Sequence, residues 1–215
     1  MPQLYYYPGN ASLVPHIVLE EIGAPFELTL VDRTQGAHKS PGYLRLNPNG
    51  LIPVLVDGDL VLYETAAIVL HLADTHPAAA LAPPLGTAAR AQYYKWLVWC
   101  TNSLQAMLLH YFYPQRMVDD GDTAAAAQVK AHAETRIGAL LDQVEAALDA
   151  HNGPWLLGAA YSAADPLLFV LCRWTRAFTR PARALPSVGL YLQRMLLRPA
   201  VQRAFATEEI APPLV

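Results

Sequence analysis

Residues 47–65 read NPNGLIPVLVDGDLVLYET, and this stretch decides the fold. Asp57-Gly58 lies between two apolar runs, residues 54–56 and 60–62, and this dipeptide between strand residues is typical of a β-hairpin. Pro53 interrupts the first run, and a proline inside a strand pattern indicates an edge, a bulge or a cis peptide bond. Glu64-Thr65 leads into a segment rich in Ala, Ile, Val and Leu, which predicts a helix directly after the hairpin.

The same stretch suits the binding of a short acidic peptide. We expect the Ile52-Pro53 bond to be cis, with the N–H and C=O of Ile52 free of sheet partners, so that an extended peptide can pair with them as an added strand. The free N–H groups at the start of the helix behind Glu64-Thr65 can hold a carboxylate. In the alternative interpretation, Pro53 only kinks an edge strand and Glu64-Thr65 only caps a helix.

The chain divides into two regions of different character. Short strands over residues 4–7 and 26–31 flank a helix over residues 12–22, and with the hairpin they give the β-α-β, β-β-α order of a thioredoxin-like domain. Prolines and a glycine gather near residues 77–86, and apolar residues beyond them recur at helical spacing. The sequence therefore predicts an α/β domain over residues 1–77, a linker over 78–87 and an all-helical bundle over 88–215.

One local motif predicts a helix start inside the bundle. Ser162 and Asp165 have the hydroxyl and carboxylate spacing of a capping box, just before the apolar run 167–171. Pro166 follows in the first helical turn, where its missing N–H costs little. We expect this pair to have a structural role.

Composition excludes several classes of function. The 215-residue chain is 53% hydrophobic, which is enough to bury a large core, and its net charge of −3 includes no basic block for nucleic acid. The apolar stretches are shorter than the roughly 18 to 20 residues of a membrane span, so we expect a cytoplasmic protein with no membrane or nucleic-acid partner. Cys100 and Cys172 lie in apolar helical segments, which favours inert buried thiols.

The motif of residues 47–55, followed by Glu64-Thr-x-Ala-Ile, resembles the glutathione-binding half of cytosolic glutathione transferases, and the resemblance extends over essentially the whole chain. It implies a homodimeric detoxification enzyme that attaches the thiolate of glutathione to small hydrophobic electrophiles. Glutathione would be the co-substrate, and no metal is implied. Alternatives are a glutathione-dependent peroxidase or disulfide reductase, and a non-catalytic glutathione-binding or interaction protein of the same fold.

The resemblance also implies how glutathione is held. The cysteinyl backbone would pair with Ile52, beside Pro53, and the γ-glutamyl end would meet the N–H and hydroxyl of Thr65, with Glu64 near the ammonium group. The basic pair His38-Lys39 would hold the glycine carboxylate through charge-assisted hydrogen bonds. The alternative for this pair is a solvated loop.

A donor to the glutathione sulfur is expected just after the first strand, because a thiol with a pKa near roughly 8.5 needs such a donor to ionise at neutral pH. Residues 6–17 resemble the opening of the bacterial beta class, with Ala11 at the position of the class cysteine. Ser12 is the first candidate and Asn10 the second, although Ser12 can also simply cap the helix. Tyr6 is the third, with packing in the sheet as its alternative. His16 is expected to be a packed or surface residue.

A wall for the second substrate is expected on the helical region, where its apolar members can also be ordinary bundle core. The beta class carries a His-Lys pair on the fourth helix, and Gln105-Ala106 stands there in this chain, which weakens any transfer of cysteine-type activity. The expected wall comprises Asn102, Gln105, Ala106, Leu109, Tyr113 and Trp174.

Overall fold

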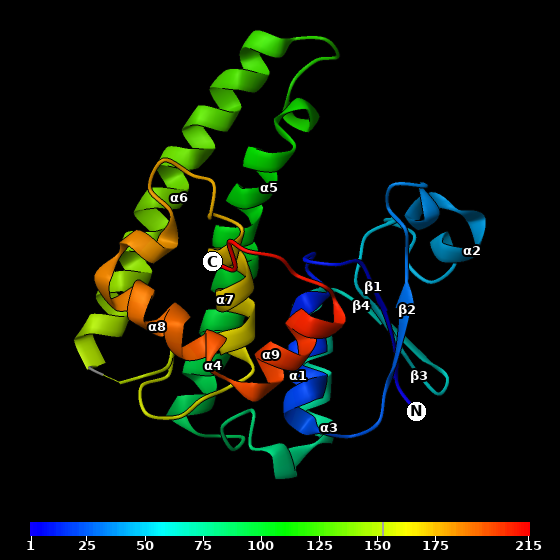
Figure 1. Ribbon diagram of the computed structural model, residues 1–215, viewed down its shortest axis with the longest axis vertical. Coiled ribbons are helices and arrows are strands. Elements are labelled where there is room, and N and C mark those ends of the chain that lie inside the picture. The colour runs from blue at the N-terminus through cyan, green and yellow to red at the C-terminus, as the bar shows by residue number, and fades with distance from the viewer. Residues whose placement is uncertain (152) are drawn as a thin grey trace. The chain divides into compact units, whose positions relative to one another are not determined.

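The computed structural model describes residues 1–151 and 153–215, which form two compact units (Figure 1). The first comprises Met1–Pro83 and Met195–Leu214, and the second comprises Pro84–Arg194 with Val215. The boundary near residue 83 lies inside the predicted linker, 78–87. The segment 195–214, which the sequence places in the predicted helical domain 88–215, packs within the first unit.

The first unit contains a four-stranded sheet in the order β2-β1-β3-β4. β1 pairs in parallel with β2, whereas the β1–β3 and β3–β4 pairs are antiparallel, which confirms the predicted thioredoxin-like arrangement. The first two strands are shifted or shorter than predicted, because pairing between them covers only four residues each. The strands are β1 (Gln3–Tyr6), β2 (Glu27–Leu30), β3 (Val54–Asp57) and β4 (Leu60–Tyr63).

Helices cover both faces of this sheet (Figure 1). Leu4 and Leu55 are completely buried on the face covered by α1 and α3. On the opposite face, Tyr43 of α2 packs with Tyr5 and Val54. The helices of the first unit are α1 (Leu13–Ile22), α2 (Pro41–Leu44), α3 (Thr65–Thr75) and α9 (Pro199–Thr207).

The predicted hairpin is confirmed, with its turn one residue later than the sequence indicated. Asp57 pairs with Leu60 and closes the ladder, so Gly58 and Asp59 form the two-residue turn. Gly58 has φ +59°, in the left-handed region that a side chain disfavours. The helix predicted over residues 12–22 begins at Leu13 and ends at Ile22. Gly23 caps it with φ +72°, and the Gly23 N–H bonds back to the carbonyl of Leu19.

The second unit is helical, as predicted, and its longest helix supplies much of the core. Five of the buried side chains of α6 follow the predicted helical spacing: Ile137, Leu140, Leu141, Val144 and Leu148. One feature was not predicted, because the six residues that follow α4 form a π-helix, Cys100–Gln105. The helices are α4 (Ala88–Trp99), α5 (Ala106–Phe112), α6 (Thr123–His151), α7 (Ala164–Arg173) and α8 (Pro186–Leu196), the last of which extends two residues past the unit boundary.

The capping box before α7 is confirmed. The Asp165 carboxylate accepts the N–H of Ser162 at 2.8 Å, and the Ser162 hydroxyl accepts the N–H of Ala164 at 3.3 Å. The second carboxylate oxygen accepts the N–H of Leu156 at 2.9 Å, so Asp165 also ties the preceding loop to the helix. This buried network gives hydrogen-bond partners to backbone N–H groups that would otherwise lose their water partners on folding.

Both cysteines are buried in the second unit, as predicted. Burial raises the pKa of Cys172 to about 12 and holds the pKa of Cys100 well above its usual value. Both side chains therefore remain protonated thiols near neutral pH, and neither is an activated nucleophile.

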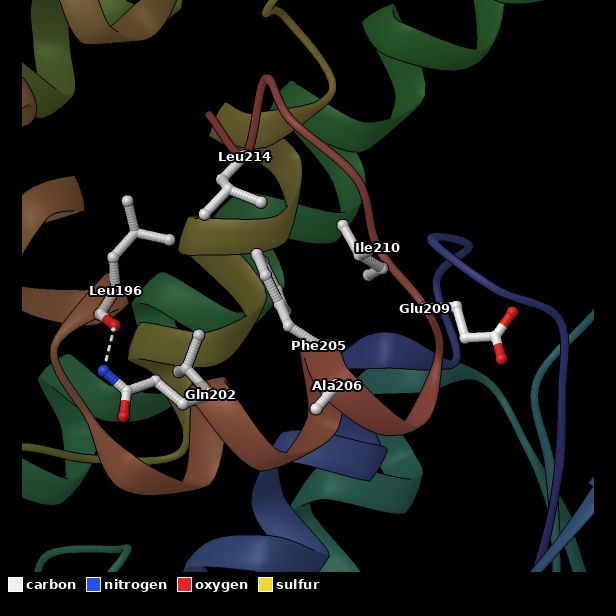
Figure 2. Close-up of a pocket in the computed structure, with 8 residues that line it drawn as sticks. Leu196, Gln202, Phe205, Ala206, Glu209, Ile210 and Leu214 are labelled. Carbon is white, nitrogen blue, oxygen red and sulfur yellow. Dashed lines mark hydrogen bonds between the residues drawn. The ribbon is translucent and has the colours of Figure 1, made fainter.

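The C-terminal helix α9 packs against α1, and this packing explains its place in the first unit. Arg198 pairs with Glu21, and Arg203 pairs with Glu20. The end of α8, one side of α9 and the tail after α9 line an open, largely apolar cavity of about 330 Å³ (Figure 2). The residues that line it are Leu196, Val201, Gln202, Phe205, Ala206, Glu209, Ile210 and Leu214.

Candidate functional site

The loop before β3 is fixed by hydrogen bonds from two side chains. The Ile52-Pro53 bond is cis, as predicted, and Ile52 lies outside the paired register of β3, which begins at Val54. The carbonyl of Leu51 accepts the Tyr43 hydroxyl at 2.8 Å and the side-chain amide of Asn47 at 2.9 Å. Tyr43 keeps its proton for this bond, because burial raises the pKa of its phenol. The backbone beside Ile52 is therefore held in one conformation.

The start of α3 is a second rigid feature of the same unit. Glu64 precedes the helix with φ +73° and ψ +114°, a conformation that is rare for a residue with a side chain and costs about 1 to 3 kcal/mol. Glu64 is the N-cap residue of α3, but its exposed side chain makes no capping bond to the helix. Thr65 is 5% exposed, and among the described residues its hydroxyl has no hydrogen-bond partner. Strain of this kind is typical of ligand-binding backbone.

The basic pair lies against the loop before β3. Lys39 donates from Nζ to the carbonyl of Asn49 at 3.2 Å. Gly50 allows this approach, because a Cβ at that position would lie 2.7 Å from Lys39 Nζ and 2.9 Å from the carbonyl oxygen of His38. The structure thus brings His38 and Lys39 together with residues 47–52, although they are separated from them by α2.

The surroundings of His38 favour its neutral form. Partial burial lowers its pKa, and the positive charges of Arg33 and Lys39 lower it further. Its buried Nδ1 has no hydrogen-bond partner among the described residues. An anion next to this ring would counter the positive charges of Arg33 and Lys39 and raise the pKa toward the protonated form.

The two leading donor candidates both lie between β1 and α1, but their side chains have different surroundings. Ser12 is 0% exposed, and its hydroxyl donates to the Tyr7 carbonyl and accepts the Tyr7 N–H, both at 3.2 Å. Its backbone is already helical (φ −60°, ψ −22°), so it does not cap α1 with its side chain either. Asn10 is half-buried; its Oδ1 accepts the Ala11 N–H at 2.6 Å, and the amide nitrogen has no partner among the described residues.

Tyr6 faces the opposite side of the sheet from Tyr5 and Tyr7, as strand alternation predicts. Its ring lies edge-on to His16 at 6.4 Å. Burial, together with the negative charges of Glu208 and Glu209, raises the pKa of its phenol. Tyr6 therefore lies near His16 of α1 and the two carboxylates that follow α9, on the other face from the Ile52 cluster.

The residues expected to contact a second substrate all belong to the second unit. Asn102 and Gln105 lie on the π-helix, Ala106 and Leu109 on α5, Tyr113 directly after α5, and Trp174 directly after α7. Gln105 Oε1 is buried without a hydrogen-bond partner in the part of the chain that the structure describes. A π-helix often marks a functional site, and no sequence signal predicted this one.

Sequence reasoning missed three residues that shape the site. Asn47 was part of the quoted motif, where an Asn before Pro signals a turn, but its side-chain bond to Leu51 was not foreseen. Tyr43 carried no signal. Glu208, which accepts the Gly9 N–H at 2.8 Å, is 199 residues away from its partner in sequence.

Family models match both parts of the chain. Residues 2–74 match the N-terminal domain of glutathione S-transferases, and residues 108–208 match their C-terminal domain. Together these matches cover most of the chain.

This chain belongs to the glutathione S-transferase family.

Glutathione S-transferase GST-4.5 of Xanthomonas campestris pv. campestris is 34% identical over 206 residues, which covers 96% of this chain and 98% of that protein. Disulfide-bond oxidoreductase YfcG of Escherichia coli K12 is 30% identical over 225 residues, which covers 98% of this chain and 97% of that protein. The structure of a glutathione transferase homologue from Sulfitobacter, solved with bound glutathione, superposes with a TM-score of 0.88 at 29% identity over 96% of this chain and 98% of that one.

The described residues of this member of the glutathione S-transferase family lack two further features. Within them, no three or more His, Cys, Asp or Glu side chains are grouped as a metal ion would require. No helix there has the length and apolar character needed to cross a membrane.

The close approach at Gly50 generates a testable prediction. Gly50→Ala should lower the free energy of unfolding for two reasons. Placing a residue with a side chain in the left-handed conformation costs roughly 1 to 2 kcal/mol, and the contact of the new Cβ with the His38 carbonyl costs at least about 1 kcal/mol more. Gly58→Ala is the matched control, since Gly58 has nearly the same φ, +59°, and nothing within 4 Å of the added Cβ. Urea denaturation of both variants measures the difference, and equal destabilisation would show that the contact costs nothing.

Proposed function

We propose that this protein binds glutathione on its first unit and transfers the glutathione thiolate to small hydrophobic electrophiles. The observation that carries the proposal is the grouping of three features in that unit. They are the fixed loop at Ile52-Pro53, the strained Glu64 with Thr65 at the start of α3, and the pair His38-Lys39 packed on the loop. The glutathione bound in the Sulfitobacter homologue supports the same ligand.

Each end of the tripeptide has a complementary group. The cysteinyl backbone pairs with Ile52, beside Pro53, in the manner of an added strand. The γ-glutamyl carboxylate accepts hydrogen bonds from the Thr65 hydroxyl and from the free N–H groups of the first turn of α3, where the helix dipole favours an anion. The Glu64 carboxylate attracts the adjacent ammonium group. At the other end, the glycine carboxylate lies near His38 and Lys39.

Asn10 is the thiolate donor in this proposal, which reverses the order of Asn10 and Ser12 expected from the sequence. The Ser12 hydroxyl is committed to the backbone of Tyr7 in a fully buried position. The Asn10 amide nitrogen is available, and its own Oδ1 bond to the Ala11 N–H orients it. Ala11 supplies no thiol of its own, so the nucleophile is the sulfur of glutathione.

The second substrate and the quaternary structure are also proposals. Gln105, Leu109 and Trp174 belong to the set of the second unit that would contact the electrophile, with the Gln105 amide as its polar group. Exposed apolar side chains on β4 and on α4 and α5, among them Val61 and Val98, support a homodimer.

A second candidate is the reduction of disulfides by glutathione, supported by the similarity to YfcG. Two glutathione thiols would be oxidised to glutathione disulfide while the substrate disulfide is reduced to two thiols. Cys100 and Cys172 would take no part, because both are buried with raised pKa values. The glutathione thiolate would be the attacking nucleophile in either reaction.

Removal of the Thr65 hydroxyl tests the orientation of glutathione. Thr65→Ala should weaken glutathione binding by about tenfold or more, because a hydrogen bond to a charged group contributes roughly 1.5 to 3 kcal/mol. Thr75→Ala, at the other end of α3, is the matched control, since its hydroxyl bonds only within the helix and its neighbouring His76. Calorimetry on the folded variants decides, and an unchanged dissociation constant for Thr65→Ala would contradict this orientation.

Removal of each donor candidate tests both the reaction and the role of Asn10. The assay follows the conjugation of glutathione to an activated aromatic halide as a function of pH, with reduction of a glutathione mixed disulfide measured in parallel. A donor that stabilises the thiolate lowers the thiol pKa, so Asn10→Ala should raise the pH midpoint of kcat/KM by roughly 1 to 2 units. Ser12→Ala should leave the midpoint in place and reduce stability.

Each outcome of this assay has a definite meaning. A midpoint that moves for Ser12→Ala but not for Asn10→Ala would restore Ser12 as the donor. Turnover of the mixed disulfide without turnover of the halide would establish the second candidate. Turnover of neither substrate, with glutathione bound, would make the protein a glutathione-binding protein without either activity.

A further inference from the structure

A buried carboxylate connects the C-terminal end of the first unit to the loop that carries Asn10. Glu208 directly follows α9, and its side chain is completely buried. One oxygen accepts the N–H of Gly9 at 2.8 Å, and the other lies 2.7 Å from Nδ1 of His16. A buried carboxylate is costly unless it is paired and hydrogen-bonded, so this arrangement calls for a specific role.

His16 completes the connection from the side of α1. Its ring is fully buried between Tyr6 and Phe26, with the ring of each edge-on to it. Nε2 lies 4.0 Å from Glu20 of the next helical turn and has no hydrogen-bond partner among the described residues. Glu208 is therefore the one close polar partner of this imidazole in the described part of the chain.

The position of Glu208 is fixed by the helix that precedes it. Two ion pairs, Arg198 with Glu21 and Arg203 with Glu20, fasten α9 to α1, and the two helices lie side by side in Figure 1. The carboxylate thus reaches the loop from a helix that is itself held on both its first and its later turns. The loop is short, since α1 begins only four residues after Gly9.

The bond to Gly9 acts next to the proposed thiolate donor. Gly9 has φ +68°, so the chain turns sharply at this residue, and Asn10 follows it directly. The Asn10 N–H bonds back to the Tyr7 carbonyl at 3.1 Å, which makes residues 7–10 one tight turn. Displacement of the Gly9 amide would redirect Asn10, and a misplacement of about 1 Å can cost a reaction about a hundredfold in rate.

We propose that Glu208 is a positioning residue for the reaction: it holds the Gly9 amide, with His16 as its buried counterpart, and thereby aims the Asn10 amide at the glutathione sulfur. The proposal rests on the proposed function of Asn10. Glu208 itself contacts neither glutathione nor the electrophile in this account. The C-terminal helix thus contributes to the chemistry through the backbone of the N-terminal loop.

The chain offers a matched control for the charge of Glu208. Glu209 is the next residue, is exposed, and bears the same charge, and the two carboxylates both act on Tyr6. Figure 2 shows the Glu209 carboxylate turned away from the apolar side chains of α9 and the tail. A purely electrostatic effect on the site would appear in Glu209→Gln as well as in Glu208 variants, whereas a positioning effect would not.

Kinetics of three variants test the proposal. Glu208→Ala should reduce kcat by about tenfold or more, with little change in KM for glutathione, and should raise the pH midpoint of kcat/KM toward the free-thiol value near roughly 8.5. Glu208→Gln should restore most of the activity, because its amide can accept from Gly9 and donate to His16 Nδ1. Glu209→Gln should leave the midpoint unchanged. An equal midpoint shift in Glu209→Gln, or none in Glu208→Ala, would overturn the proposal.

Amide hydrogen exchange gives a readout that is independent of activity. In the wild-type protein the Gly9 N–H should be protected; Glu208→Ala should accelerate its exchange at least about tenfold, and Glu208→Gln should not. If Glu208→Ala fails to fold, Glu208→Asp replaces it, since the shorter side chain cannot reach both partners. Unchanged exchange in the folded variant would overturn the positioning role. If Glu208→Ala accelerates Gly9 exchange but the wild-type protein does not turn over glutathione, the link between Glu208 and Gly9 would stand and the proposed function would be rejected.

Discussion

Pro53 imposes the constraint on which the site depends. A proline has no N–H to donate, so the ladder between β1 and β3 stops at Val54, and the backbone at Ile52 is left outside it. A free backbone edge is useful only if it is held still. The Leu51 carbonyl supplies that restraint by accepting two hydrogen bonds, from Tyr43 and Asn47. The missing side chain of Gly50 then lets the basic pair close over the same loop.

The two ends of the proposed peptide site use different physics. At the start of α3, unpaired backbone N–H groups and a strained Glu64 present dipoles that need no reorganisation when an anion arrives. At the other end, His38 and Lys39 supply mobile side-chain charge, and the lowered pKa of His38 makes its protonation dependent on the ligand. Dipoles fix the orientation of a ligand more strictly than a flexible ammonium group does. We therefore expect the γ-glutamyl end to determine specificity.

The sequence predicted the features that depend on neighbouring residues. The hairpin, the cis bond at Pro53 and the Ser162-Asp165 box are each encoded within a few residues, and each is present. No motif decided between Ser12 and Asn10, because the direction of the Ser12 hydroxyl depends on the helical backbone at that residue and on its bonds to the Tyr7 backbone. Glu208 and His16 are separated by 192 residues, so no periodicity or motif could pair them. The place of α9 in the first unit was missed for the same reason.

The most direct test of the account is the thiol pKa of glutathione bound to the wild-type protein. It can be measured by ultraviolet difference titration of the thiolate in the absence of an electrophile. An amide donor at the start of α1 should lower this pKa by at least about one unit from the value of a free thiol, about 8.5. Bound glutathione that titrates like the free tripeptide would contradict a thiolate site built from Asn10 and the loop that holds it.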